Sequence, residues 1–319
     1  MSYRFGVDIG ATRTMFALVE EHGSHIVAHD RPNTEVILTG SRAPCDALAG
    51  AMERFLAGRD LTGEDLLGVG VGVPGTIEHE TGRVLTCPNL RLLDGADLGS
   101  GVAERLGVPV WVDNNTNLIA LGEHAAGIAQ GMDNVAVVFV GSGVGCGLIL
   151  NGELYRGGGG LAGELGHTSV VPNGLLCDCG GRGCVEMYCS GKALSTVAGH
   201  IFEPRELFDL GTRFDGARLV IDQAVAGHDR ARRAMVQAFT YLGYALANLA
   251  VLLSPEVIVL GGGVVKAWPE GVDVVSRVID QAVRIGGDRN LEILQSRLQD
   301  FAGVLGGATL VAQCCARGN

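Results

Sequence analysis

The chain has 319 residues, of which 47% are apolar, so it is long and hydrophobic enough for one large or two medium folded domains and is not a disordered chain. It carries 24 basic and 35 acidic residues, a net charge of −11, and no basic cluster, which speaks against a nucleic-acid or anionic-membrane partner. An anionic ligand would have to be held locally, by backbone N–H groups or by a metal ion.

The N-terminus runs directly into an apolar strand without the cleavage region of a signal peptide. The apolar stretch 244–254 is too short to span a membrane. We therefore expect a cytoplasmic protein with no membrane partner. Nine cysteines is an odd number, and in a reducing compartment clustered cysteines indicate a metal site before a disulfide.

Apolar periodicity predicts the elements in chain order. The first part of the chain is predicted to form strands at 5–9, 15–20 and 26–30, a helix at 43–56, a strand at 67–73, a helix at 96–106, a strand at 108–112 and a helix at 116–128. The pattern then restarts, with strands at 134–140 and 146–150, helices at 192–200, 217–226 and 229–253, a strand at 257–260, a helix at 272–283, a strand at 291–294 and a closing helix at 304–316.

A strand, a glycine turn and a second strand occur twice, at 5–19 and at 135–150. This duplication predicts two similar α/β lobes with a ligand cleft between them. We expect the N-terminal lobe to comprise residues 1–116, with the closing helix at 301–319 packed back on it. The C-terminal lobe would comprise residues 117–300.

The most specific pattern is His167-x9-Cys177-x-Cys179-x4-Cys184. One imidazole and three thiolates form a tetrahedral zinc set that leaves no open position, which favours structural Zn²⁺ over catalytic zinc. The glycines between the last two cysteines allow the tight turns that such a site needs. The surrounding segment, 157–186, has little apolar periodicity, so the metal would organise it.

Two glycine turns are candidate phosphate sites. The first is DIGAT at 8–12, where a carboxylate at a strand end could hold hydrated Mg²⁺. The second is GSGVG at 141–145, which is not followed by the helix of a dinucleotide fingerprint. Each pattern is common in ordinary turns, but their equivalent places in two lobes strengthen both. The glycines at 261–263 either pass beneath an adenosine or only form a loop.

Together these segments resemble the ROK family (repressors, open reading frames, kinases). The resemblance covers essentially the whole chain, and its most specific part is the stretch from Glu164 to Glu186 with the zinc pattern inside it. It implies the two-lobed actin-like/hexokinase (ribonuclease H-like) fold, with an interlobe cleft and a zinc-binding loop. The implied activity is ATP-dependent phosphorylation of an aldohexose at its 6-hydroxyl. The resemblance also implies a homo-oligomer, namely a dimer.

The resemblance assigns roles to individual positions. For the nucleotide and its Mg²⁺ they are Asp8, Gly10, Thr12, Gly141, Ser142, Gly143, Gly261, Gly262 and Gly263. For the sugar hydroxyls they are Asn89, Asn114, Glu164, His167 and Glu186. His167 would serve twice, with one ring nitrogen on zinc and the other facing the sugar.

One position departs from the family pattern. The family's general base is the aspartate of Asn-Asp-x-Asn, and here that position is Asn115, which cannot accept a proton. Three explanations stay open: an introduced substitution that traps substrates, a natural variant that turns over slowly, or Asp113 acting as the base instead.

The identity of the sugar is also open, with allose, glucose and N-acetylated hexosamines considered in that order. Allose comes first because four segments resemble family members that phosphorylate it: CPNL at 87–90, CSG at 189–191, GGGV at 261–264 and DFAG at 300–303. A catalytically silent sugar-binding or regulatory protein is the alternative function. A DNA-binding repressor is disfavoured because the phosphate pattern begins at residue 8, and a purely structural zinc protein leaves the glycine turns unexplained.

Overall fold

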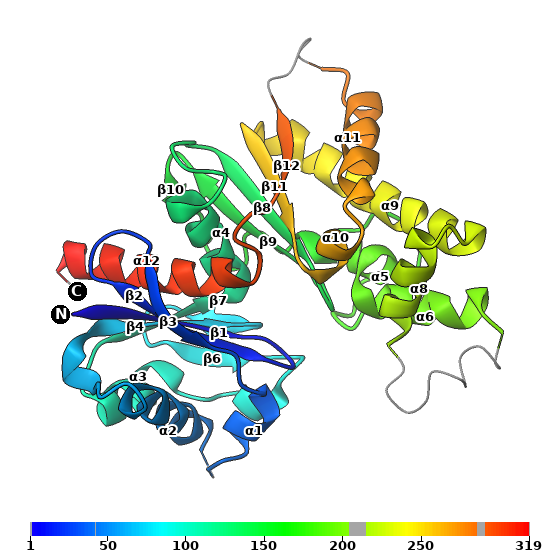
Figure 1. The fold of residues 1–319 in the computed structure, drawn as a ribbon. Coiled ribbons are helices and arrows are strands. Elements are labelled where there is room, and N and C mark those ends of the chain that lie inside the picture. The colour runs from blue at the N-terminus through cyan, green and yellow to red at the C-terminus, as the bar shows by residue number, and fades with distance from the viewer. Residues whose placement is uncertain (1, 42, 204–214, 286–290, 319) are drawn as a thin grey trace. The chain divides into compact units, whose positions relative to one another are not determined.

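The structure is a computed structural model that describes residues 2–41, 43–203, 215–285 and 291–318. The chain divides into two compact units. Unit 1 holds residues 1–133, 147–162 and 297–319, and unit 2 holds residues 134–146 and 163–296. Two five-stranded sheets with helices packed on them form the α/β architecture that the sequence predicts (Figure 1).

Unit 1 is built on a mixed sheet with the strand order β3-β2-β1-β4-β7. Its strands are β1 (Tyr3–Ile9), β2 (Thr14–Glu20), β3 (Ile26–Asp30), β4 (Leu66–Val73) and β7 (Val110–Asn114). β1, β4 and β7 are parallel, and their register aligns Asp8 with Gly72 and Gly72 with Asp113. Both carboxylates therefore lie at the carboxyl ends of parallel strands, which is where open α/β sheets place ligands.

Helices cover both faces of this sheet. They are α1 (Thr34–Leu38), α2 (Pro44–Ala57), α3 (Leu98–Leu106), α4 (Asn115–Ala126) and α12 (Ala302–Arg317), with short 3₁₀ turns at Gly63–Asp65, Arg91–Leu93 and Gln299–Phe301. A small hairpin of β5 (Thr76–Glu78) and β6 (Arg83–Thr86) is added. The sequence pattern did not predict α1 or this hairpin, because both are short and their periodicity is weak.

Alternation along the strands explains which helix lies on which face. Phe5 and Phe16 point to one face, where their rings pack with Phe55 of α2 at centroid distances of 5.3–5.8 Å. α12 lies on the opposite face (Figure 1), so close to β1 that a Cβ on Gly6 would lie 2.0 Å from the Val304 carbonyl oxygen. Glycine at this position is therefore required for the closing helix to pack on the sheet.

The second sheet has the strand order β10-β9-β8-β11-β12. Its strands are β8 (Val135–Val140), β9 (Val144–Leu150), β10 (Glu153–Leu154), β11 (Val257–Gly261) and β12 (Glu292–Gln295). β11 pairs in parallel with β8 and β12. The helices of unit 2 are α5 (Glu186–Cys189), α6 (Gly191–Ile201), α8 (Gly216–Val225), α9 (Asp229–Leu253), α10 (Gly263–Ala267) and α11 (Glu270–Ala282), with a 3₁₀ turn at Leu165–His167.

The division into units differs from the predicted ranges 1–116 and 117–300. α4 belongs to unit 1 because it packs on α12: a Cβ on Gly122 would lie 2.0 Å from the Ala302 carbonyl oxygen. The segment 147–162 also belongs to unit 1. The turn signals mark the ends of elements, but they do not reveal which sheet an element packs against.

α9 is long and apolar enough, by length and composition, to cross a membrane, and half of its most apolar window is buried inside the structure. Its buried side chains include Met235, Phe239, Leu242 and Leu246. They form one helical stripe, and α9 packs on α8 and α11. Packing within unit 2 thus accounts for the buried stripe of α9, whereas Tyr244, Val251 and Leu252 of the same helix are exposed.

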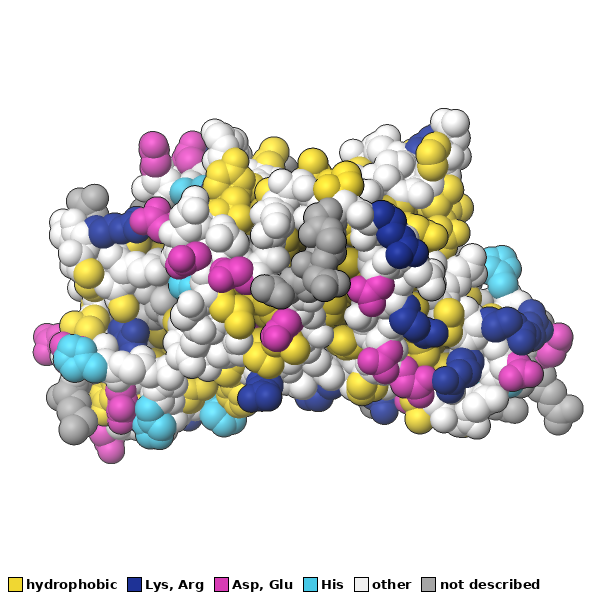
Figure 2. All heavy atoms as spheres, turned by 90° about the horizontal axis from the view of Figure 1, so that it is seen from above, with side chains coloured by type: hydrophobic (Ala, Val, Ile, Leu, Met, Phe, Trp, Pro, Cys, Tyr) yellow, Lys and Arg dark blue, Asp and Glu magenta, His cyan; other side chains and the backbone are white. Residues whose placement is uncertain are grey.

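Basic side chains on the surface lie among acidic ones (Figure 2). Two examples from unit 2 are the pairs Arg232–Glu270, at 2.6 Å, and Arg218–Asp222, at 2.8 Å.

Candidate functional site

The first glycine turn joins β1 to β2, with Asp8 near the end of β1. A hydrogen bond of 3.0 Å from the Gly10 N–H to the Arg13 carbonyl closes the turn, and Thr12 is exposed beside it. Burial raises the pKa of Asp8 to about 7, and the charge of Arg31 acts in the opposite direction. Oδ1 of Asp8 is buried and lacks a hydrogen-bond partner within the described part of the chain.

The first turn of α12 lies against the same carboxylate, since a Cβ on Gly303 would be 2.4 Å from Oδ2 of Asp8. The first turn of a helix has N–H groups without intrahelical partners and the positive end of the helix dipole. A buried carboxylate with an unused oxygen beside such a helix end fits a hydrated Mg²⁺ and a phosphate.

The second glycine turn joins β8 to β9. The Gly141 N–H donates to the Gly143 carbonyl at 2.9 Å, and Ser142 is exposed at the tip. The turn is also tied to the start of α6, because the Gly191 N–H donates to the Gly141 carbonyl at 2.7 Å. A Cβ on Gly141 would have no atom within 4 Å, so the backbone there is open to a ligand.

Glu186, at the start of α5, reaches this second turn. Its Oε2 accepts a hydrogen bond of 2.9 Å from the Val144 N–H, and it would lie 2.4 Å from a Cβ on Gly143. Gly143 is therefore needed for the carboxylate to approach the turn. The resemblance assigns separate roles to these two segments, and no sequence pattern indicates that they are in contact.

The third glycine segment follows β11. A Cβ on Gly261 would lie 2.3 Å from the ring of Phe139, and one on Gly262 would lie 2.4 Å from the Val140 carbonyl oxygen. Gly262 also has φ of 90°. Close packing on β8 thus explains these two glycines. Gly263 alone has open space around its Cα and fits the approach of a flat ligand.

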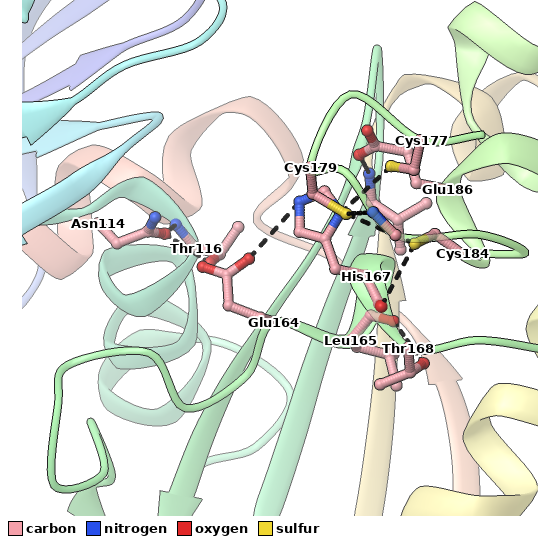
Figure 3. A network of polar contacts seen from close by, with 12 residues as sticks. Asn114, Thr116, Glu164, Leu165, His167, Thr168, Cys177, Cys179, Cys184 and Glu186 are labelled. Carbon is pink, nitrogen blue, oxygen red and sulfur yellow. Dashed lines mark hydrogen bonds and ion pairs between the residues drawn. The ribbon is translucent and has the colours of Figure 1, made fainter.

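The predicted zinc ligands converge in unit 2 (Figure 3). The ligand atoms of His167, Cys177, Cys179 and Cys184 all lie within 4.8 Å of one another. Sγ of Cys179 and Sγ of Cys184 are 3.6 Å apart, close to the roughly 3.8 Å between two thiolates that share a tetrahedral zinc at about 2.3 Å. The donor set and its geometry therefore fit Zn²⁺.

His167 faces two ways. Its Nδ1 lies 3.6 Å from Sγ of Cys177, and its Nε2 lies 3.9 Å from Oε2 of Glu164, as the dashed lines in Figure 3 show. Burial raises the pKa of Glu164, His167 lowers it, and the charge of Glu186 raises it. One imidazole thus connects the cysteine cluster to a carboxylate.

The Asn-rich turn lies where β7 meets α4, in unit 1. Asn114 caps α4: its Oδ1 accepts hydrogen bonds from the N–H and hydroxyl of Thr116, at 2.8 and 2.6 Å, and its Nδ2 donates to the Gly75 carbonyl at 3.0 Å. Asn115 is the first residue of α4. Asn89 is exposed in the turn that follows β6.

Asp113 is held by several donors and is only 1% exposed. Its Oδ2 accepts from Nε and Nη2 of Arg156, at 2.8 and 2.6 Å. Its Oδ1 accepts from the Asn114 N–H at 2.7 Å and from Nδ2 of Asn117 at 2.8 Å. These contacts occupy both oxygens of the Asp113 carboxylate, which argues against Asp113 as the group that replaces the base at position 115.

The family model described as "ROK family" matches residues 4–314. The chain belongs to the ROK family.

Among ROK relatives, the glucokinase of Halalkalibacterium halodurans is 32% identical over 314 residues, covering 97% of this chain and 94% of that protein. The xylose repressor of Caldicellulosiruptor bescii is 34% identical over 254 residues, covering 78% of this chain and 63% of the repressor. A ROK glucokinase from Streptomyces griseus has been solved in complex with glucose and AMPPNP. Its structure superposes on this chain with a TM-score of 0.83 at 32% sequence identity, and the match covers 98% of this chain and 100% of that one. This match confirms the hexokinase-like α/β fold.

Within the ROK fold, the predicted site residues fall into two groups. Unit 1 carries Asp8, Gly10, Thr12, Asn89, Asn114 and Asn115. Unit 2 carries Gly141, Ser142, Gly143, Glu164, His167, Cys177, Cys179, Cys184, Glu186, Gly261, Gly262 and Gly263. In unit 2, the sugar-assigned Glu186 contacts the phosphate-assigned turn directly.

Sequence reasoning missed Arg156 and His79. His79 has Nδ1 3.7 Å from Oδ1 of Asp113, and Arg156 is the buried carboxylate's charge partner. The only local signal for Arg156 is its place directly before the glycine run 157–160. Because Asp113 and Arg156 are 43 positions apart, no periodic pattern links them.

Proposed function

We propose that this ROK protein is an ATP-dependent hexose kinase that transfers the γ-phosphoryl group of ATP to the 6-hydroxyl of an aldohexose. The observation that carries the proposal is the match, over 98% of the chain, to a ROK glucokinase solved with glucose and AMPPNP. The chain retains the carboxylate, glycine turns and zinc ligands that such an activity needs.

ATP would be bound at the glycine turns. Asp8, Gly10 and Thr12 would face the β- and γ-phosphates and their Mg²⁺, and the second turn, 141–143, would supply further N–H groups. The unpartnered Oδ1 of Asp8 supports this role, because it can accept a hydrogen bond from metal-bound water. When bound, Mg²⁺ neutralises charge on the phosphates. The open backbone at Gly263 supports contact with the adenosine.

Zn²⁺ would be structural. His167 and the three cysteines provide four ligands, so no position is left for a reacting water. The ion would fix the imidazole of His167 and, through it, the direction of the Glu164 carboxylate. The zinc loop would thereby give shape to the sugar site.

Orientation of the sugar would come from Glu164, Glu186 and His167, with Asn89 and Asn114 as further hydrogen-bonding groups. A carboxylate can accept hydrogen bonds from two hydroxyls at once, which fixes the rotation of a pyranose ring. Asn115 would lie at the family's base position and would only orient the attacking hydroxyl. We expect this exchange of Asp for Asn to reduce the rate by about 10²–10⁴-fold.

Glucose is the first substrate to test, since the relatives that are at least 31% identical over nearly the whole chain include glucokinases. Allose is the second, on the loop patterns at 87–90, 189–191 and 300–303. N-acetylated hexosamines come third. Epimers differ in the configuration of one hydroxyl. Selectivity therefore depends on whether an epimer leaves a buried polar group of the site without its hydrogen-bond partner.

The test is ADP release from ATP and a panel of aldohexoses and hexosamines, measured for this chain and for Asn115→Asp. Strong activity of Asn115→Asp on one sugar, with this chain nearly silent, supports the proposal and identifies the substrate. Equal activity of both forms means that another group takes the proton. Silence of both forms with every sugar rejects the kinase proposal.

A sugar-binding protein with little turnover is the second candidate, and Asn115 favours it because an amide cannot accept the proton. The similarity to a xylose repressor shows that the family also includes regulators. Sugar binding by calorimetry without ADP release, in both this chain and Asn115→Asp, would select this candidate.

We also propose that the protein works in the cytoplasm as a homodimer, without nucleic-acid or membrane partners. The net charge of −11 supports the absence of a nucleic-acid partner. Light scattering coupled to size exclusion would report twice the 33.1 kDa chain mass for a dimer.

A further inference from the structure

An ion pair between Asp113 and Arg156 joins two segments of unit 1. In sequence, each segment lies next to residues that we have assigned to the sugar. Arg156 presents Nε and Nη2 to a single oxygen, Oδ2 of Asp113, at 2.8 and 2.6 Å. Asp113 is 1% exposed and the Arg156 side chain 31% exposed. Charge-assisted bonds of this kind fix direction as well as distance.

On one side, the pair orders the Asn-rich turn. Oδ1 of Asp113 receives the Asn114 N–H and Nδ2 of Asn117, so the carboxylate spans the last residues of β7 and the first turn of α4. Asn115 lies between these two donors in the chain. Any rotation of the Asp113 carboxylate would therefore shift the backbone that carries Asn114 and Asn115.

On the other side, the pair anchors a glycine run. Residues 157–160 are all glycine, with φ of 73° at Gly157 and 72° at Gly160. The Ala162 N–H returns to the Arg156 carbonyl at 3.1 Å, which closes the loop. A Cβ on Gly160 would lie 3.2 Å from Nε2 of His79, so this end of the run packs on the imidazole that also lies near Asp113.

Four consecutive glycines carry no side chains that could hold their own conformation, and each has large backbone freedom. Arg156, the residue directly before this run, ties its start to β7 through the ion pair with Asp113. The run leads directly to Gly163 and Glu164, a residue to which we have assigned a sugar hydroxyl. Within unit 1, the Asn-rich turn and the start of the glycine run therefore share one guanidinium as an anchor.

We propose that Arg156 is a positioning residue for sugar binding and phosphoryl transfer: by holding Asp113, it fixes the Asn114–Asn115 turn and the glycine loop 157–160 in one arrangement. This inference rests on the proposed function. Arg156 acts through Asp113 and the backbone and does not itself touch the sugar. Lysine would not replace it, because an ammonium is a point charge without the two parallel donors of the guanidinium.

The experiment measures glucose and allose affinity by calorimetry, with melting temperature, for the full chain and for Arg156→Lys, Arg156→Met and the double variant Asp113→Asn/Arg156→Met. The double variant removes both charges, so it avoids the unpaired buried carboxylate that destabilises the single variant. Arg105→Met is the matched control, because Arg105 makes a similar two-nitrogen contact to Glu53 on the surface of α2 and α3.

We expect both single variants to bind the sugar about tenfold or more weakly, because small displacements of binding groups have large effects. The control should bind as the parent does. The double variant should regain the melting temperature but not the affinity. In the Asn115→Asp background, we expect Arg156→Lys to lower kcat/KM by about tenfold or more as well.

Two results overturn the inference. One is parental affinity in Arg156→Met. The other is a double variant that regains affinity together with its melting temperature, which would mean that the pair only stabilises the fold. Failure of the proposed function looks different: the parent then binds no sugar and Asn115→Asp releases no ADP, and the inference falls with it.

Discussion

The backbone N–H of Val144 donates a hydrogen bond of 2.9 Å to Oε2 of Glu186. Within unit 2, a carboxylate assigned to the sugar is therefore bonded to the turn assigned to a phosphate. Loss of the Glu186 side chain is therefore expected to affect binding of both the sugar and the nucleotide.

Glu186→Ala should weaken both sugar and AMPPNP binding, since it leaves the Val144 N–H without its acceptor. Glu186→Gln retains an acceptor oxygen and should weaken mainly the sugar. A lost hydrogen bond to a charged group corresponds to about 10–100-fold in affinity. Calorimetry with each ligand separately would check this. Equal AMPPNP affinity in both variants and the parent would contradict the coupling.

Zinc content offers a second prediction. We expect elemental analysis to find one Zn²⁺ per chain. Cys184→Ser should lose the ion. Its melting temperature should fall by roughly 5 °C or more, because the metal contributes several kcal/mol of folding free energy. Cys315→Ser is the control, since Cys315 is exposed and lies outside the cluster. Full zinc occupancy in Cys184→Ser would show that the cluster is not the site.

Two glycines of the zinc loop should respond differently to alanine. Gly183 has φ of 74°, and its Cβ would lie 1.8 Å from the Val171 carbonyl oxygen, whereas Gly180 has φ of 86° but open space. Gly180→Ala should cost only backbone strain, about 1–2 kcal/mol, while Gly183→Ala should also displace backbone and lower zinc affinity. Melting curves and competition with a zinc chelator would distinguish them. Indistinguishable variants would refute the packing argument.

The stability of the unliganded protein should depend on pH through Asp8. Its pKa is raised from 3.8 to about 7, so the folded state binds the proton more tightly than the unfolded state. Folding is therefore penalised as pH rises from about 4 to 7, by roughly 4 kcal/mol in total.

Asp8→Asn should accordingly raise the melting temperature more at pH 8 than at pH 4, while weakening binding of Mg²⁺ with AMPPNP. Glu104→Gln, an exposed change on α3, is the control. A stabilisation that is the same at both pH values would mean that Asp8 does not ionise over this range.

Much of the fold could be predicted because its signals are local. Apolar runs bounded by glycine identified β1, β4, β8 and β11, and helical spacing identified α2, α9 and α12. The errors concern assignment of elements to units. α4 was expected to follow the second sheet, but it packs on α12, whose sequence is almost 180 positions away, and no pattern in either helix reveals that contact.

The sequence by itself determined which four residues could bind zinc, because ligand type and spacing lie within one short segment ending at Cys184 and glycine lets that segment turn. It also determined that the residue at position 115 cannot act as a general base, since the Asn115 amide does not accept a proton in any geometry. Only the tertiary structure decided that Asp113 is held by Arg156, that Asp8 lies against Gly303, and that Glu186 reaches Val144. These partners come from different elements, and packing of sheets and helices alone selects which distant polar groups meet.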